Sequence, residues 1–412
     1  MTALASGPPP PPLLGAADQR LWPDELRLLL GDGAGEVLGV AVAAAGGELR
    51  SWRPRQVTHQ PAQSTVVQYR AEVAWPDHTV TSETIVAATG SRLPAGAAVL
   101  DDGTTKVGLW RWPGDPSLPG LAGALDRDRV GRLLDDLGVD GGTLQLRVRA
   151  YRPGRRAVVE ATGRRGRLFL KVVRPEAVEA LHRTHRALAA SLPVPDSLGW
   201  SEDGVLVLPG LPGRTIRELL RSGHSQLPAP ASIGALLNRL PGSLTTGPLR
   251  RDHRTSAEHH ARVITSVLPS LQGRLDALLA DLHDREPADH EVVAVHGDLY
   301  EAQILVERGR VVGLLDVDTA GPGHRVDDIA NLCAHLSVLA LMSEHPKVIR
   351  RYGAAVLAHA ETTFDRADLR ARIAAAVVGL ATGPFRVLEP AWPQNTLRRV
   401  ALAAEWLGGA TR

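Results

Sequence analysis

The segment VVAVHGDLYEAQILVERGRVVGLLDVD, residues 292–318, constrains this 412-residue chain more than any other part of it. Two apolar runs, Val292–Val295 and Val311–Leu315, have the length and composition of short buried strands. Acidic residues follow both runs, with Asp298 after the first and Asp316 after the second. Asp and Gly are common turn formers, so turn chemistry is one explanation for these positions. The alternative is a site that binds a metal ion and a polyphosphate at two strand ends.

The composition excludes several classes of protein. An apolar fraction of 44% and a charged fraction of 22% are those of an ordinary globular protein. The formal net charge of +2 gives no electrostatic reason to expect nucleic acid or an anionic membrane as a partner. The single cysteine, Cys333, excludes an intramolecular disulfide and predicts a reducing, cytoplasmic setting. No apolar stretch approaches the roughly 20 residues of a membrane-spanning helix.

The pattern of apolar residues, glycines and prolines predicts five consecutive segments. The first is a proline-rich flexible leader, because it lacks the basic and long apolar regions of a secretory signal. Strand-like runs then give way to helical periodicity along the chain. The predicted segments are a leader at 1–20, a β-rich N-terminal cap domain at 21–110, a connector and helix at 111–142, a small strand-rich lobe at 143–210 and a larger helical lobe at 211–412. Residues 58–70 resemble residues 150–162 in sequence, and duplication of a β-hairpin is one explanation of this resemblance.

Lysine is unusually rare in this chain. Of 47 basic residues only three are lysine, and Lys171 lies in the middle of the apolar strand-like run LFLKVV. A lysine usually faces solvent, but one that is retained inside a strand in such a chain is better explained as a cation for phosphate oxygens. Gly154, in the predicted turn between two preceding strands, would let backbone amides approach the same phosphates, although glycine is ordinary in hairpin turns.

The acidic segment has the residue types that phosphoryl transfer requires. That reaction needs Mg²⁺, a cation on the phosphates and an acceptor held in line. Asp316 and Gln303 offer the oxygen ligands that Mg²⁺ prefers. Asp298, in a loop after a strand, is in the position of a base that accepts a hydrogen bond from an acceptor hydroxyl. A metal-dependent hydrolase using His296, Asp298 and Asp316 is the competing interpretation, weakened by the lack of a second His/Asp cluster nearby.

The segment HGDLYEAQILV…GRVVGLLDVDTAGPGHRVDDIANL resembles the catalytic segment of the aminoglycoside phosphotransferase and choline kinase superfamily. The resemblance covers roughly 140–412 and implies a protein-kinase-like fold. It implies that Asp298 is the catalytic aspartate, that Gln303 and Asp316 bind the metal, and that Lys171 contacts the α/β-phosphates of ATP. It also implies that His296 and Asp328 support the catalytic loop.

The departures from the family pattern refine this expectation. Gln303 stands where Asn is usual in the family. In this, and in having an N-terminal cap domain, the chain resembles maltokinase-like actinobacterial sugar kinases. The helix-borne glutamate that pairs with the lysine is expected to be Glu179, with Glu176 as the alternative. The adenine hinge is expected near Leu208–Leu211, with backbone groups of Leu208 and Leu211 as partners because Pro209 has no N–H.

These observations predict an α+β, two-lobed protein-kinase-like fold preceded by a β-rich cap. The predicted activity is ATP- and Mg²⁺-dependent transfer of the γ-phosphoryl group to a hydroxyl of a small molecule. Gly297 stands where protein kinases have an arginine that reads a phosphorylated activation loop, and this favours a small acceptor: a sugar, amino sugar or aminoglycoside. The expected protein is a monomer or homodimer. The alternative is a catalytically weak binding or regulatory protein that retains the fold.

Overall fold

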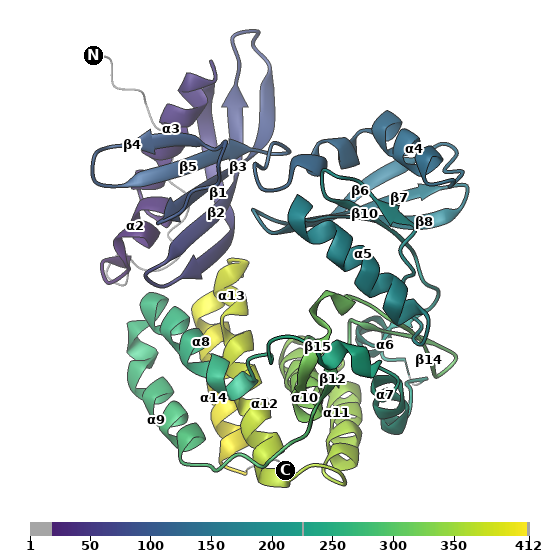
Figure 1. The fold of residues 1–412 in the computed structure, drawn as a ribbon. Coiled ribbons are helices and arrows are strands. Elements are labelled where there is room, and N and C mark those ends of the chain that lie inside the picture. Colours follow the sequence, from purple (N-terminus) through teal and green to yellow (C-terminus); the bar gives the residue numbers. More distant parts are fainter. Residues whose placement is uncertain (1–18, 225, 410–412) are drawn as a thin grey trace.

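The structure, a computed structural model, describes residues 19–224 and 226–409. All but the last two residues of the predicted leader at 1–20 lie outside the described residues. Figure 1 shows an N-terminal domain and a small β-sheet lobe side by side above a helical lobe. The mixed α+β architecture with a sheet-rich and a helical lobe is the predicted protein-kinase-like arrangement, and the strand-rich N-terminal domain is also present.

The described part of the N-terminal domain contains two helices that the β-rich prediction did not include. They precede an antiparallel five-stranded sheet of order β1-β2-β3-β5-β4. The glycine- and valine-containing segment of the second helix has no strong helical pattern, and its packing against the sheet overrides this weak propensity. The elements are α2 (Asp24–Leu30), α3 (Gly33–Ala44), β1 (Glu48–Gln60), β2 (Ser64–Ala74), β3 (Val80–Gly90), β4 (Ala98–Asp101) and β5 (Lys106–Arg111).

A connector and a second five-stranded antiparallel sheet follow. The helix expected within residues 111–142 is α4 (Arg127–Asp136), and the Asp126 carboxylate caps it by accepting from two backbone amides of its first turn. The second sheet has the order β6-β7-β8-β10-β9, the same order as in the N-terminal domain. This shared order agrees with the resemblance between residues 58–70 and 150–162. The elements are β6 (Gln145–Arg152), β7 (Arg156–Gly163), β8 (Gly166–Val172), α5 (Pro175–Ala189), β9 (Gly199–Trp200) and β10 (Val205–Pro209).

The helical lobe has the largest apolar core of the described chain. Helices α10, α12 and α14 pack on one another, and a three-stranded and a two-stranded sheet carry the catalytic segment. No described helix combines the length and apolarity needed to cross a membrane. The elements are β11 (Arg214–Thr215), α6 (Ile216–Arg221), α7 (Pro230–Leu237), α8 (His253–Val267), α9 (Gln272–His283), β12 (Val292–Val295), β13 (Ile304–Glu307), β14 (Arg310–Leu314), β15 (Gly321–His324), α10 (Arg325–Met342), α11 (Pro346–Ala360), α12 (Arg366–Ala381), α13 (Gly383–Arg386) and α14 (Trp392–Leu407), with short 3-10 turns at Pro119–Leu121, Gly123–Leu125, Gly242–Thr245, Pro269–Leu271 and Val317–Thr319.

The N-terminal domain shares a hydrophobic core with the helical lobe. Trp22 donates a hydrogen bond from its indole nitrogen to the backbone oxygen of Val267 at 3.1 Å. Its ring packs edge-on against Phe385 of α13, and Phe385 in turn packs against Trp392. Because these buried aromatic side chains link the two parts, the N-terminal domain fixes the position of α13.

Candidate active site

The loop after β12 is held by a buried carboxylate from α10. Asp328 is only 2% exposed and accepts hydrogen bonds from the backbone amides of His296 and Gly297, both at 2.8 Å. The His296 ring lies within 2.9 Å of the backbone oxygen of Leu315, which ties the loop to the end of β14. Both residues therefore contact the loop that the sequence analysis expected them to support.

Gly297 is required by this loop geometry. Its φ is +79°, a left-handed conformation, and a Cβ atom there would lie 2.5 Å from the backbone oxygen of Thr319. A larger residue at this position would displace the adjacent Asp298. The missing arginine at this position therefore has a local steric cause.

Asp298 lies at the edge of an open cavity between the lobes. Its Oδ1 is 3.4 Å from the side-chain nitrogen of Asn331, which also donates to the backbone oxygen of Leu299 at 3.1 Å. Burial raises the pKa of Asp298, and nearby Asp316 adds to this, although His296 acts in the opposite direction. A carboxylate with a raised pKa is a better proton acceptor near neutral pH.

Asp316 brings the predicted lysine and amide together with an arginine that the sequence analysis missed. Lys171 Nζ lies 2.8 Å from Asp316 Oδ1. Arg156, at the start of β7, donates to both carboxylate oxygens at 3.1 and 3.2 Å. The Gln303 side-chain nitrogen lies 3.4 Å from Asp316 Oδ2. Burial would raise the pKa of Asp316, but Lys171 and Arg156 outweigh it and hold that pKa well below its ordinary value.

A second acid, Asp318, completes this cluster. It forms an ion pair with Lys171, and its Oδ1 has no hydrogen-bond partner among the described residues although it is buried. His185 of α5 faces it, with 3.6 Å between His185 Nε2 and Asp318 Oδ1. We refer to Lys171, Arg156, Asp316 and Asp318 as the ion cluster.

The predicted pairing of Glu179 with Lys171 is wrong. Glu179 lies on the exposed face of α5, where its carboxylate accepts from Arg183 at 2.8 Å. Glu176, the alternative, is also exposed. The face of α5 that packs inward carries Val178 and His185, seven residues apart, so a histidine and not a glutamate is directed at the ion cluster.

Gly154 lies at the predicted turn, but its amide is already bonded. It has a φ of +67° and donates its N–H to Asp115 Oδ2 at 2.7 Å. Tyr151 donates to the same carboxylate oxygen at 2.9 Å, and Arg174 donates to the Gly154 carbonyl. The Gly154 amide itself is therefore occupied in this conformation, and the approach of backbone amides of this turn to phosphates stays a prediction. Buried Asp115 of the connector instead anchors the turn.

The predicted hinge lies at the end of an incompletely paired strand. In β10, Val207 pairs with β9, but Leu208 and the residues after it have no strand partner on that edge within the described chain. The Gly210 amide donates to the Arg167 carbonyl at 2.8 Å. Leu208 is buried, and Leu211 packs its side chain toward Gly313. Leu208 also pairs with Phe169 of β8, so adenine binding by the backbone groups of Leu208 and Leu211 stays a prediction.

The acidic residues fit a magnesium ion that is held together with phosphates. No group of three or more His, Cys, Asp or Glu side chains surrounds a common point in the described ranges. Mg²⁺ is commonly bound through one or two carboxylates, waters and substrate phosphates, so a complete protein cage is not needed. Asp316, Gln303 and the buried, unpartnered Oδ1 atom of Asp318 supply suitable oxygen ligands.

The cavity beside Asp298 has a volume of about 480 Å³, in the range of small-molecule sites. Side chains of the small lobe, the catalytic loop and helices α6, α10, α13 and α14 line it. We call it the acceptor cavity. Its lining residues are Arg152, Arg217, Arg221, Asp298, Tyr300, His335, Val338, Leu339, Met342, Gly379, Leu380, Thr382, Gly383, Arg386, Val387, Glu389 and Arg399.

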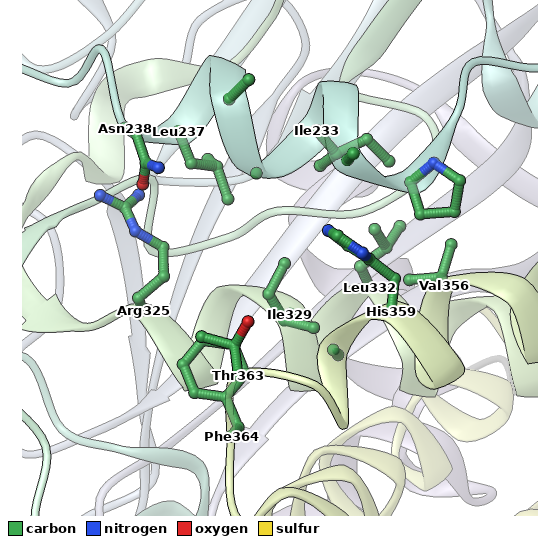
Figure 2. A pocket seen from close by; sticks show the side chains of 15 residues that line it. Ile233, Leu237, Asn238, Arg325, Ile329, Leu332, Val356, His359, Thr363 and Phe364 are labelled. Carbon is green, nitrogen blue, oxygen red and sulfur yellow. The ribbon is translucent and has the colours of Figure 1, made fainter.

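A second cavity, of about 350 Å³, lies between α7, α10 and α11 (Figure 2). Figure 2 shows Arg325 and Asn238 at one end and mainly apolar side chains around the rest. None of the sequence-predicted site residues lines this cavity. Because it contains no group suited to phosphoryl transfer, it is not the candidate active site.

Several residues of the site were not assigned from the sequence: Arg152, Arg156, His185, Asp318, Tyr300, His335 and Asp115. Arg156 could not be distinguished because nearly all basic residues of this chain are arginines. His185 could have been found, since it shares the apolar face of its helix with Val178. Asp115 lies in a proline-rich connector whose path cannot be deduced from local patterns.

Comparison with known proteins agrees with this architecture. The sequence matches the profile of the phosphotransferase enzyme family over residues 147–372, more than half of the chain. A comparison with curated proteins gave no significant match. The chain therefore belongs to the phosphotransferase enzyme family, and is a small-molecule kinase as predicted.

Solved structures of similar chains include a macrolide 2'-phosphotransferase from Brachybacterium faecium, with 21% identity, 70% of this chain and 99% of that chain covered, and a TM-score of 0.40. A type VIII aminoglycoside-3'-phosphotransferase has 24% identity, covers 61% of this chain and 97% of its own, and has a TM-score of 0.41. A choline/ethanolamine kinase family protein from Mesorhizobium loti has 16% identity, 69% and 95% coverage, and a TM-score of 0.45.

Proposed function

We propose that this protein transfers the γ-phosphoryl group of ATP, with Mg²⁺, to a hydroxyl of a small polar acceptor of the sugar class. The single observation that carries this proposal is the ion cluster beside Asp298. Two carboxylates that suit a metal and two cations that suit phosphates form this cluster, and Asp298, a carboxylate with a raised pKa, lines the acceptor cavity.

In this proposal Asp298 orients the acceptor hydroxyl and receives its proton. A new bond forms between the acceptor oxygen and the γ-phosphorus, while the bond from that phosphorus to the β–γ bridging oxygen breaks and ADP leaves. Asp316 and Gln303 would hold Mg²⁺, which would supply positive charge that stabilises the phosphates when it is bound. His296 and Asp328 keep the Asp298 loop in position through the hydrogen bonds described above.

Lys171 and Arg156 have a second role in this proposal. Both cations are paired with Asp316 in this structure. When Mg·ATP binds, the ion pairs between these cations and Asp316 would break. The two cations would then bind phosphate oxygens, and Asp316 would bind the metal. Backbone groups of Leu208 and Leu211 bind adenine, and the Asp115-anchored turn at Gly154 covers the phosphates.

The acceptor class rests on the size and the lining of the acceptor cavity. Tyr300 and His335, which stack with their ring centroids 4.4 Å apart, both line this cavity and place aromatic groups beside a bound acceptor. Sugars, amino sugars and aminoglycosides all offer hydroxyls to Asp298, and the resemblance to maltokinase-like sugar kinases favours the first of these.

The substitution Asp298→Asn tests the proposal. It retains size but removes the negative charge, so kcat should decrease by roughly 10²–10⁴-fold, while Mg·ATP affinity should remain close to that of the wild type. ATP consumption is measured with a panel of sugars, amino sugars and aminoglycosides, and Mg·ATP binding by calorimetric titration. A large loss of nucleotide affinity in this variant would show that Asp298 is a metal ligand and not the base.

The pH dependence gives a second readout for the same residue. Because burial raises the pKa of Asp298, the wild-type kcat/KM should decrease as the pH falls through a value above the ordinary 3.8 of aspartate. The residual rate of Asp298→Asn should lack this acidic limb. A wild type that does not bind Mg·ATP at all would favour the alternative, a binding or regulatory protein with the same fold.

A further inference from the structure

The charges that line the acceptor cavity are strongly unbalanced. Five arginines line it, against two carboxylates, those of Asp298 and Glu389. The net charge of the whole chain is only +2, so this concentration of positive charge is local and does not follow from overall composition. The five arginines come from the small lobe and from helices α6, α13 and α14: Arg152, Arg217, Arg221, Arg386 and Arg399.

Two of these arginines already have partners. Arg217 donates to the fully buried carboxylate of Glu301 at 2.7 Å, and its guanidinium lies over the Tyr300 ring. Arg399 is buried, donates to the Leu380 carbonyl at 2.8 Å and lies 3.6 Å from Glu389. Their positions are thus explained by the packing of the lobe.

The other three arginines are not explained in this way. Arg152, Arg221 and Arg386 form no side-chain hydrogen bond or ion pair with any residue in the described part of the chain. They approach the cavity from the small lobe, from α6 and from α13. Unpaired guanidinium groups that converge on one cavity repel one another, and this repulsion destabilises the folded state. A bound anion would offset the repulsion.

The pKa values of His335 and Arg152, which also line the cavity, are lowered in part by the positive charge around them. Burial, with smaller contributions from Arg217, Arg399 and Arg386, lowers the pKa of His335 to about 3. Burial also lowers the pKa of Arg152, and both Arg156 and Arg386 add to that effect. His335 is therefore neutral at physiological pH, and a cationic acceptor would meet only repulsion from the guanidinium groups around it.

We infer that the acceptor bears an anionic group, a phosphate or a carboxylate, which Arg386, Arg221 and Arg152 bind while its hydroxyl is presented to Asp298. This inference rests on the proposed function for the identity of the reacting group. The planar guanidinium forms paired hydrogen bonds with either kind of anion. The packing of Trp22 against Phe385 holds α13 and so gives the N-terminal domain a part in acceptor recognition.

Direct binding tests the inference without requiring turnover. Glucose, glucosamine, glucose 6-phosphate, glucose 1-phosphate and glucuronate are titrated calorimetrically into the full-length protein saturated with Mg·ADP. At least one anionic sugar should bind about tenfold or more tightly than glucose, and glucosamine should bind no better than glucose. Comparison of the two glucose phosphates with glucuronate shows whether the protein prefers a phosphate or a carboxylate.

Two arginine variants locate the binding group. Arg386→Gln should reduce affinity for the preferred anionic sugar by about 10- to 100-fold, since one charge-assisted contact is lost. Arg398→Gln removes the same charge from the exposed face of α14, outside the cavity, and should leave that affinity as in the wild type. Mg·ADP affinity of both variants verifies that the nucleotide site is folded.

Each outcome has one meaning for the inference. Equal or weaker binding of all anionic sugars relative to glucose would overturn it, as would preferential binding of glucosamine. An anionic preference that Arg386→Gln and Arg398→Gln reduce equally would also overturn it, because the effect would then arise from net charge alone. A protein that fails to bind Mg·ATP or Mg·ADP refutes the proposed kinase activity, and anion binding to the nucleotide-free protein then decides the inference separately.

Discussion

Replacement of Lys171 by methionine should separate the structural role of the ion cluster from its role in nucleotide binding. Lys171 is 6% exposed and contacts two carboxylates, Asp316 and Asp318, whose side chains are 19% and 18% exposed. Methionine has a similar length and no charge, so the substitution removes the ion pairs without creating a large cavity.

The expected magnitude follows from the partners that remain. Removal of one partner from a buried ion pair costs about 3–5 kcal/mol, because the other charge stays buried. Here Arg156 still contacts Asp316 at 3.1 Å and the carboxylates retain some contact with solvent. We therefore expect the free energy of unfolding to decrease by about 2–3 kcal/mol, below the full cost of an unpaired buried charge.

A matched lysine provides the control. Lys106 also forms an ion pair, with Asp101 at 3.1 Å, but its side chain is 67% exposed. The substitution Lys106→Met should therefore change the free energy of unfolding by less than about 1 kcal/mol. Urea unfolding of both variants and the wild type, followed by circular dichroism, measures the difference.

The pH dependence of this effect has a defined sign. Lys171 and Arg156 hold the pKa of Asp316 below its ordinary value of 3.8 against the opposing effect of burial. A lowered pKa contributes stability that is present above the unfolded-state value and lost as the pH falls below it. The stability difference between the wild type and Lys171→Met should thus be largest near neutral pH and decrease below about pH 4.

Magnesium provides the decisive measurement. Without Lys171, the two carboxylates should bind Mg²⁺ more tightly, so Mg²⁺ alone should restore part of the lost stability of the variant and affect the wild type less. The reasoning is refuted if Lys171→Met is as stable as Lys106→Met, or if Mg²⁺ stabilises the variant and the wild type to the same extent.

Three further substitutions address the other parts of the site. Asp316→Ala should reduce kcat by roughly 10²–10³-fold or more without unfolding the chain, because the metal loses its main carboxylate; activity of the wild type in EDTA would contradict this. Arg156→Gln should raise the KM for ATP by about tenfold, whereas Arg155→Gln, its exposed neighbour, should leave it near the wild-type value; equal KM values would exclude a phosphate role. Asp115→Ala should also raise the KM for ATP, by about tenfold, because the Gly154 turn loses its anchor; an unchanged KM would mean that the turn does not need the connector.

The sequence predicted the local elements of the site well, and for a clear reason. A short apolar run bounded by turn residues favours a strand, so the strand at Val292–Val295 was predicted with its observed bounds, although Val292 is 45% exposed. The approach of Lys171 to Asp316, 145 residues apart, is different. No local pattern encodes that distance, and only the family resemblance suggested it before the structure did.

The errors also have identifiable causes. Glu179 was selected because its residue type suits a lysine partner, but helix geometry decides which side chains face inward, and Glu179 is one position from the buried Val178. Helix α3 was missed because its tertiary packing, and not its intrinsic propensity, stabilises it. Arg386 and Arg152 converge only through the packing of separate lobes, which a single sequence does not reveal.

The pairing of Lys171 with the metal-binding acid, and not with a helix glutamate, has a consequence for substrate binding. Mg²⁺ alone would have to displace Lys171 and Arg156 from Asp316, which would leave two partly buried cations to share the single carboxylate of Asp318. A phosphate alone would have to withdraw the same cations and leave Asp316 unpaired. When both arrive together, each exchange compensates the other, because the phosphates take the cations as the metal takes the carboxylate. The ion cluster therefore favours binding of the preformed Mg·ATP complex over stepwise binding of its parts, and it preserves a neutralised site when no nucleotide is present.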